Sequence, residues 1–200
     1  VLRVCGADLR LVPAAPYKDP ANYVRYSERL ATELVKTHDG GVIWANQFDN
    51  TANMRGHYDS TGPEIWQQTG GTIDGFICAV GSGGTLSGVG RYLKDQNAAV
   101  KIGLADPEGS ALHQYYETGE LKSSGNSISE GIGQGRITKN LAEAPVDMSF
   151  CLTDEDALPL IYDLMQHEGL YLGGSTAINV AGALAMAREL GPDCTIVTIL

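Results

Sequence analysis

The sequence has 200 residues, of which 43% are hydrophobic and 19% charged, which is enough apolar material for a sizeable core in one large domain or two small ones. Its 14 basic and 24 acidic residues give a formal net charge of −10, which argues against diffuse attraction to nucleic acid or to anionic lipid. No apolar run reaches the length of about 18 residues that a membrane span requires.

Short β-type runs alternate with helical patterns along the chain. We expect strands, from their β-branched and apolar residues, over residues 8–12, 41–45, 73–80, 100–105, 146–152 and 194–200. We expect helices, from capping residues and apolar spacing, over residues 20–37, 61–69, 84–95, 153–167 and 175–190. Asp19 would cap the first helix, and Thr61-Gly62-Pro63-Glu64 would form a capping box for the second. The alternation predicts an α/β protein with a mostly parallel sheet buried on both faces.

The first candidate site is Gly81-Ser82-Gly83-Gly84-Thr85, between a predicted strand and a predicted helix. Its glycines let the backbone approach a ligand, and the helix start supplies free N–H groups. We interpret this run as a phosphate-binding loop, with an ordinary glycine-rich turn as the alternative. It lacks the lysine of a Walker A loop and does not complete GxGxxG. Asp106 follows about 20 residues later, where a nicotinamide enzyme would place its ribose-binding acid, although a capping or turn role is commoner.

Three further segments could bind a ligand. Gly173-Gly174-Ser175-Thr176-Ala177 places hydroxyls at a helix start, where the alternative for Ser175 is an N-cap. Alternating glycines in residues 129–135 suggest a loop that passes close to a ligand, or else a flexible surface loop. Residues 46–50 form an amide-rich loop after a strand, of the type that binds polar ligands or simply makes a turn.

Cysteine and histidine spacing indicates no metal or redox site. The four cysteines are far apart and form no CxxC pair, which favours reduced thiols and a reducing cytoplasm. The four histidines are scattered without metal-ligand spacing.

Several of these segments together resemble cysteine synthase (O-acetylserine sulfhydrylase). The motifs that carry the resemblance occur in the family's order: Asn46-Gln47-Phe48-Asp49-Asn50-Thr51-Ala52-Asn53, His57-Tyr58, Thr61-Gly62-Pro63-Glu64-Ile65-Trp66, the Gly81–Thr85 loop, Glu130-Gly131-Ile132-Gly133 and Gly173-Gly174-Ser175. The resemblance implies the type II pyridoxal-phosphate fold, which the tryptophan synthase β subunit shares.

The resemblance also implies roles for single residues. Gly81, Ser82, Gly83, Gly84 and Thr85 would hold the phosphate of pyridoxal phosphate, with Ser82 in place of the usual threonine. Ser175 would bond the pyridine nitrogen, and a hydroxyl there favours β-elimination because it cannot keep that nitrogen protonated as a carboxylate would. Gln47 would contact the substrate carboxylate, and Gly131 would place its backbone near the substrate. Thr176-Ala177 departs from the family's common Ser-Gly.

The family's cofactor lysine lies in an upstream SxKD segment that does not occur here, and the surroundings of Lys18 do not match it. We therefore expect a fragment that is inactive alone and contains no catalytic residue, its Schiff-base lysine lying upstream. We expect residues 1–47 to be the remnant of a smaller N-terminal α/β domain. Residues 48–200 would form most of the larger, cofactor-binding domain.

The parent enzyme implied by the resemblance is a cytoplasmic homodimer that forms L-cysteine from O-acetylserine and sulfide by β-replacement. Cystathionine β-synthase chemistry is an alternative in the same family, although residues 61–66 look more like cysteine synthase. A nicotinamide dehydrogenase that uses the Gly81 loop and Asp106 is a second alternative. An inactive fragment or regulatory partner is a third.

Overall fold

The computed structural model describes residues 1–200. They divide into two compact units, Val1–Asn46 and Gln47–Leu200, and each is described by itself. The assignment of the first unit to a smaller domain and of the second to a larger one stays a prediction.

The first unit contains one helix, α1 (Tyr23–Leu34), and no strand. Asn22 caps this helix: its Oδ1 accepts the Val24 N–H at 3.0 Å, and its Nδ2 donates to the Ala15 carbonyl at 2.8 Å. The helix start predicted at Asp19 is therefore wrong. The strands predicted over residues 8–12 and 41–45 are also wrong, because neither segment pairs with a neighbour and a strand requires ladder hydrogen bonds.

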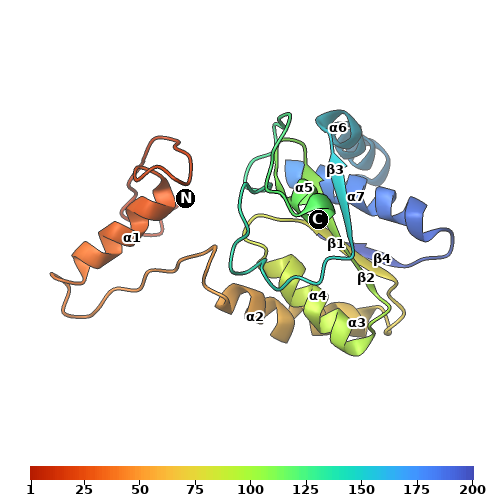
Figure 1. Cartoon of the computed structure of the whole chain (residues 1–200), viewed down its shortest axis with the longest axis horizontal. Helices are drawn as coiled ribbons and strands as arrows, with labels where there is room; N and C mark the ends of the chain where they lie inside the picture. Colours follow the sequence, from red (N-terminus) through yellow and green to blue (C-terminus); the bar gives the residue numbers. More distant parts are fainter. The chain divides into compact units, whose positions relative to one another are not determined.

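The second unit is built on a parallel four-stranded sheet (Figure 1). Its strands are β1 (Gly75–Ala79), β2 (Lys101–Pro107), β3 (Met148–Leu152) and β4 (Ile196–Thr198), in the order β3-β2-β1-β4. The chain moves outward from β1 to β2 and β3, and then returns to pair β4 with the other side of β1. This reversal makes the carboxyl ends of β1 and β4 a topological switch point, where open α/β sheets bind ligands. The predicted α/β fold class is confirmed.

Helices cover both faces of the sheet. They are α2 (Ala52–Asp59), α3 (Thr61–Gln68), α4 (Gly84–Gln96), α5 (Leu112–Thr118), α6 (Asp154–Asp163), the π-helical η1 (Leu164–Glu168) and α7 (Gly174–Leu190). The alternation along β1 sets the layers, since Phe76 joins the core cluster that contains Leu86 of α4, whereas Ile77 joins the cluster that contains Ile178 of α7. All four side chains are at most 1% exposed. Figure 1 shows α4 and α7 on opposite sides of the strands.

Two short helices, α2 and α5, were not predicted. Neither exceeds eight residues, and α2 contains Gly56 and has no side-chain bond at its N-cap, so its local signals are weak. Packing fixes α2 instead: a Cβ on Gly88 of α4 would lie 2.2 Å from the Met54 carbonyl oxygen. None of the helices combines the length and apolar character needed to cross a bilayer.

Two predicted helix starts have different outcomes. The capping box at Thr61 is wrong, because α3 takes Ser60 as its N-cap and the Thr61 hydroxyl instead contacts His57. The start at Thr153 is confirmed: its side chain accepts the Asp156 N–H at 3.1 Å, and the Asp156 carboxylate accepts in return.

Candidate functional site

The Gly81–Thr85 loop joins the carboxyl end of β1 to α4, at the switch point of the sheet. Gly83 is the N-cap of α4 with a left-handed φ of 89°, and no side chain caps this helix. The backbone N–H groups of Ser82, Gly83 and Thr85 donate to no acceptor in the protein. Free N–H groups at the positive end of a helix dipole form an anion site, and here they do so without a basic side chain in the loop.

Crowding explains why this loop needs glycine. A Cβ on Gly83 would lie 2.7 Å from the Leu141 Cβ, and a Cβ on Gly84 would lie 2.4 Å from the side chain of Asn53. Both distances are shorter than any carbon contact that a folded protein tolerates. Leu141 and Asn53 therefore pack tightly against the loop, and its free N–H groups belong to a rigid backbone.

Both hydroxyls of the loop are oriented by neighbouring side chains. Ser82 Oγ accepts a 2.7 Å hydrogen bond from Asn53 Nδ2. Thr85 Oγ1 lies 3.1 Å from His57 Nε2, and His57 Nδ1 lies 2.9 Å from Thr61 Oγ1. Burial lowers the pKa of His57, which favours the neutral ring with one donor and one acceptor nitrogen. The Thr61–His57–Thr85 chain of hydrogen bonds thus fixes the Thr85 hydroxyl. From the sequence, the histidines were considered only as metal ligands and His57 was given no role, although His57-Tyr58 is one of the motifs that carry the family resemblance.

Gly131 lies directly against this loop. A Cβ on Gly81 would come within 2.6 Å of the Gly131 carbonyl oxygen, and the Gly133 N–H donates to the Val80 carbonyl at 2.9 Å. Segment 129–135 therefore follows the end of β1, beside the phosphate-loop candidate.

Ser175 is exposed in the first turn of α7, and its hydroxyl makes no hydrogen bond within the protein. The N-cap of α7 is Gly173, so the alternative of Ser175 as an N-cap is wrong. Ser175 lines a cavity of about 330 Å³ together with Glu130 and Asp154. Since Glu130 precedes Gly131, this cavity reaches the segment that contacts the Gly81–Thr85 loop.

Asn179, which the sequence reasoning missed, fixes the start of α7 to the switch point. Its Oδ1 accepts the Ala79 N–H at 2.6 Å, and its Nδ2 donates to the Ile199 carbonyl at 2.8 Å, at 6% exposure. Ser175 lies four residues earlier on the same helix face, one turn away. A polar residue inside an apolar, Ala-rich helix was the signal that could have revealed this anchor.

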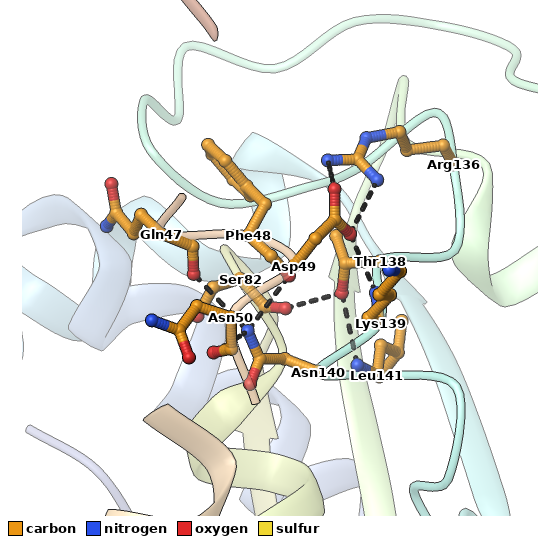
Figure 2. Close-up of polar contacts among 10 residues, drawn as sticks. All are labelled: Gln47, Phe48, Asp49, Asn50, Ser82, Arg136, Thr138, Lys139, Asn140 and Leu141. Atoms are coloured by element: carbon orange, nitrogen blue, oxygen red, sulfur yellow. Dashed lines mark hydrogen bonds and ion pairs between the residues drawn. The ribbon is translucent and has the colours of Figure 1, made fainter. Parts of the chain in front are cut away.

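Gln47 is exposed, and its carbonyl accepts a 3.3 Å hydrogen bond from Asn140 Nδ2. Figure 2 shows its side-chain amide turned away from Asn140. The neighbouring Asp49 forms a two-pronged ion pair with Arg136, both distances being 3.1 Å. Partial burial would raise the pKa of Asp49, but the hydrogen bonds from Arg136 and from the Lys139 N–H together hold that pKa below its ordinary value.

Asp106 does not present its carboxylate to a ligand. It is 1% exposed, and its Oδ2 accepts the His113 N–H at 2.8 Å, so it serves the turn into α5. Burial raises its pKa. The nicotinamide alternative therefore loses its ribose-binding acid.

The donor set suits a phosphate-bearing cofactor. The loop offers three free backbone N–H groups and two hydroxyls oriented by neighbouring side chains, and it contains no carboxylate that would repel a dianion.

Comparisons with known proteins identify the family of this chain. Residues 1–200 match the family described as pyridoxal-phosphate dependent enzyme. The chain is 47% identical to cysteine synthase 1 of Neurospora crassa and 48% identical to cysteine synthase 1 of Emericella nidulans, over 100% of this chain and 53% and 54% of those proteins. It thus spans about half the length of these relatives.

A solved structure gives the same result for the fold. The crystal structure of O-acetylserine dependent cystathionine β-synthase from Helicobacter pylori matches with a TM-score of 0.75 at 28% identity, over 86% of this chain and 54% of that chain. The pyridoxal-phosphate dependent family and the type II fold, both predicted from the motifs, are confirmed. The chain belongs to the pyridoxal-phosphate dependent enzymes.

Proposed function

We propose that the full protein is a cysteine synthase, which forms L-cysteine from O-acetylserine and sulfide with pyridoxal phosphate as cofactor. Family membership and the identity to two fungal cysteine synthases support this. The observation that carries the proposal is the convergence at the switch point: a loop of free N–H groups lies against Gly131, and Asn179 anchors the helix of Ser175 to the same strand ends.

The proposed roles follow from the chemistry of each group. The N–H groups and hydroxyls of Gly81–Thr85 bind the cofactor phosphate, and the Ser175 hydroxyl bonds the pyridine nitrogen. Bound pyridoxal phosphate supplies the electron sink that β-elimination and β-addition require. The side-chain amide of Gln47 binds the carboxylate of the amino acid, and the backbone at Gly131 limits where its side chain can lie.

The serine at position 175 bears on the type of reaction. A carboxylate partner keeps the ring nitrogen protonated, and a protonated ring withdraws electrons strongly. A neutral hydroxyl does not keep the nitrogen protonated, so the ring withdraws electrons less. Ser175 therefore favours β-replacement over reactions that need stronger electron withdrawal.

Cystathionine β-synthase chemistry is the second candidate. The H. pylori structure carries that name, and mouse cystathionine β-synthase is 36% identical over 98% of this chain. Both reactions share the β-elimination half and differ in the nucleophile, so the two candidates share the proposed roles of Ser175 and Gln47.

One assay separates the candidates. The full-length protein with added pyridoxal phosphate would receive O-acetylserine with either sulfide or homocysteine. We expect cysteine formation with sulfide to be faster, and to disappear without cofactor. Faster formation of cystathionine would favour the second candidate, and no product in either arm would contradict both.

We also propose that the cofactor lysine lies outside residues 1–200. Borohydride treatment of the loaded full-length protein, followed by peptide mapping, should place the pyridoxyl group on a lysine outside this range. A stoichiometric pyridoxyl group on Lys18, or on any other lysine of the chain, would contradict the proposal.

The remaining proposals concern assembly and location. We propose a homodimer, which light scattering of the full protein would test. The cytoplasmic location is tested by imaging the tagged full protein in its cell.

A further inference from the structure

The segment of residues 136–140, to which the resemblance assigns no role, contacts both loops of the proposed site (Figure 2). Thr138 is fully buried, and its Oγ1 donates a 2.6 Å hydrogen bond to the Ser82 carbonyl while accepting the Leu141 N–H at 3.1 Å. The peptide unit between Ser82 and Gly83 is planar and trans, so its C=O and N–H point in opposite directions. By holding the Ser82 carbonyl, Thr138 directs the free Gly83 N–H.

Asn140 holds the other loop. It is 1% exposed, and its Nδ2 donates to the carbonyls of Gln47, Phe48 and Asn50 at 3.3, 2.9 and 3.1 Å. Three carbonyl oxygens gathered around one point would repel one another without this donor. The backbone that carries the Gln47 amide is therefore shaped by the Asn140 side chain.

The same asparagine also fixes α2. Its Oδ1 accepts the Met54 N–H at 3.1 Å, which satisfies an N–H of the first helical turn that the N-cap Thr51 leaves free. One residue earlier, Asn53 donates to Ser82 Oγ at 2.7 Å. Asn140 thus reaches the Gly81–Thr85 loop through α2, while Thr138 reaches it directly.

An ion pair between Asp49 and Arg136 fixes the beginning of the segment of residues 136–140. The Asp49 carboxylate bonds both terminal nitrogens of Arg136 and also accepts the Lys139 N–H at 2.9 Å. The side chains of Asp49 and Arg136 are only 18% and 21% exposed. The segment is therefore fixed on both sides of Thr138.

We propose that Thr138 and Asn140 are positioning residues that couple the amino-acid loop to the cofactor-phosphate loop. This inference rests on the proposed function. Thr138 sets the direction of the Gly83 N–H toward phosphate, and Asn140 sets the backbone of Gln47. Neither side chain contacts a ligand itself.

Thr138 is tested in the full-length protein by its affinity for pyridoxal phosphate and by the ³¹P resonance of the bound phosphate. Thr138→Val keeps the volume but loses the hydroxyl, and we expect the dissociation constant to rise about tenfold, as for one lost hydrogen bond. Thr138→Ser should restore affinity and resonance. Thr69→Val is the matched control, because it removes a 2.9 Å bond to the Ile65 carbonyl at the end of α3 and should leave affinity unchanged. Wild-type affinity in Thr138→Val, or equal losses in the valine and serine variants, would overturn the assignment.

Asn140 is tested by Asn140→Ala with two measurements. The KM for O-acetylserine should rise about tenfold while kcat falls less. The reason is that the variant weakens the binding of the substrate carboxylate by Gln47, which acts in the ground state as well as in the transition state. Amide hydrogen exchange without cofactor should speed up over residues 47–54 and not over β2. Unchanged exchange over residues 47–54 would overturn the coupling. If wild-type protein binds no pyridoxal phosphate but the exchange pattern holds, the proposed function fails and the positioning of the loops stands.

Discussion

Two glycine-rich helix starts look alike in sequence but differ in their surroundings. In the Gly81–Thr85 loop, a Cβ on Gly81, Gly83 or Gly84 would lie 2.4–2.7 Å from another part of the protein. In the second start, a Cβ on Gly173 or Gly174 would meet nothing within 4 Å. Side chains hold the hydroxyls of the first loop, whereas Ser175 has no partner.

The difference separates two reasons for glycine. In the first loop the protein itself excludes a side chain, so the glycines fix a backbone whose N–H groups are already oriented. At the second start nothing in the protein excludes one, so any need for glycine there comes from a ligand. Substitutions in the first loop should therefore destabilise the fold, whereas substitutions at the second start should not destabilise it, and any loss there should appear in ligand binding.

Gly83→Ala should have the largest effect. Alanine would have to adopt the left-handed φ of 89° and place its Cβ 2.7 Å from Leu141. Together these should lower the free energy of unfolding by about 2–5 kcal/mol. Denaturant unfolding of the full-length protein measures this loss, and pyridoxal-phosphate affinity should fall with it. A variant with wild-type stability and affinity would show that the packing behind the loop does not constrain it.

Ser175→Ala should leave folding unchanged and reduce turnover. The hydroxyl makes no bond within the protein, so the free energy of unfolding should change by less than about 0.5 kcal/mol. Cysteine formation should fall by about tenfold or more if the hydroxyl bonds the cofactor ring. Ser175→Thr is the control that keeps a hydroxyl. Full activity in Ser175→Ala would refute the ring contact, and a large loss of stability would refute the contrast between the two helix starts.

The sequence predicts the elements of the second unit better than those of the first. Runs such as Ile73–Val80 form strands because apolar residues on both faces are buried against α4 and α7. The same kind of run over residues 41–45 remains unpaired. Strand propensity describes a residue's fit to a sheet, and the sheet must supply the partner.

The candidate site shows a similar division. The Gly81–Thr85 loop can be predicted from the sequence because its strand, its glycines and its helix follow one another along the chain. Thr138 and Asn140 are not, because each acts on carbonyl groups more than 50 residues away. No local pattern encodes such a bond, and the sequence Thr138-Lys139-Asn140 reads as an ordinary polar loop.

Acid should weaken the Asp49–Arg136 ion pair, which fixes the segment of residues 136–140 beside the Gly81–Thr85 loop. The pKa of Asp49 is lowered in the folded state, so its stabilising contribution is complete above the unfolded value of about 3.9 and disappears as pH falls through the folded pKa. Asp49→Asn should therefore cost about 1 kcal/mol at pH 7, and the difference from wild type should shrink below about pH 4. Urea unfolding of both proteins between pH 3 and 7 measures this. A difference that stays constant across that range would exclude the Asp49–Arg136 pair as its source.

Gly174→Ala should have the smallest effect on folding, and in the opposite direction to Gly83→Ala. Gly174 begins α7 with no positive φ, and its added Cβ meets nothing, so alanine should raise the free energy of unfolding by up to about 1 kcal/mol by restricting the unfolded chain and favouring the helix. If a ligand approaches this backbone closely, pyridoxal-phosphate affinity should fall in the same variant. Thermal unfolding with and without cofactor separates the effect on stability from the effect on cofactor binding. Without cofactor, the melting temperature of the variant should exceed that of the wild type. The further rise in melting temperature when pyridoxal phosphate is added should be smaller in the variant than in the wild type. A variant that is destabilised without cofactor would mean that this glycine, like Gly83, is required by the protein itself.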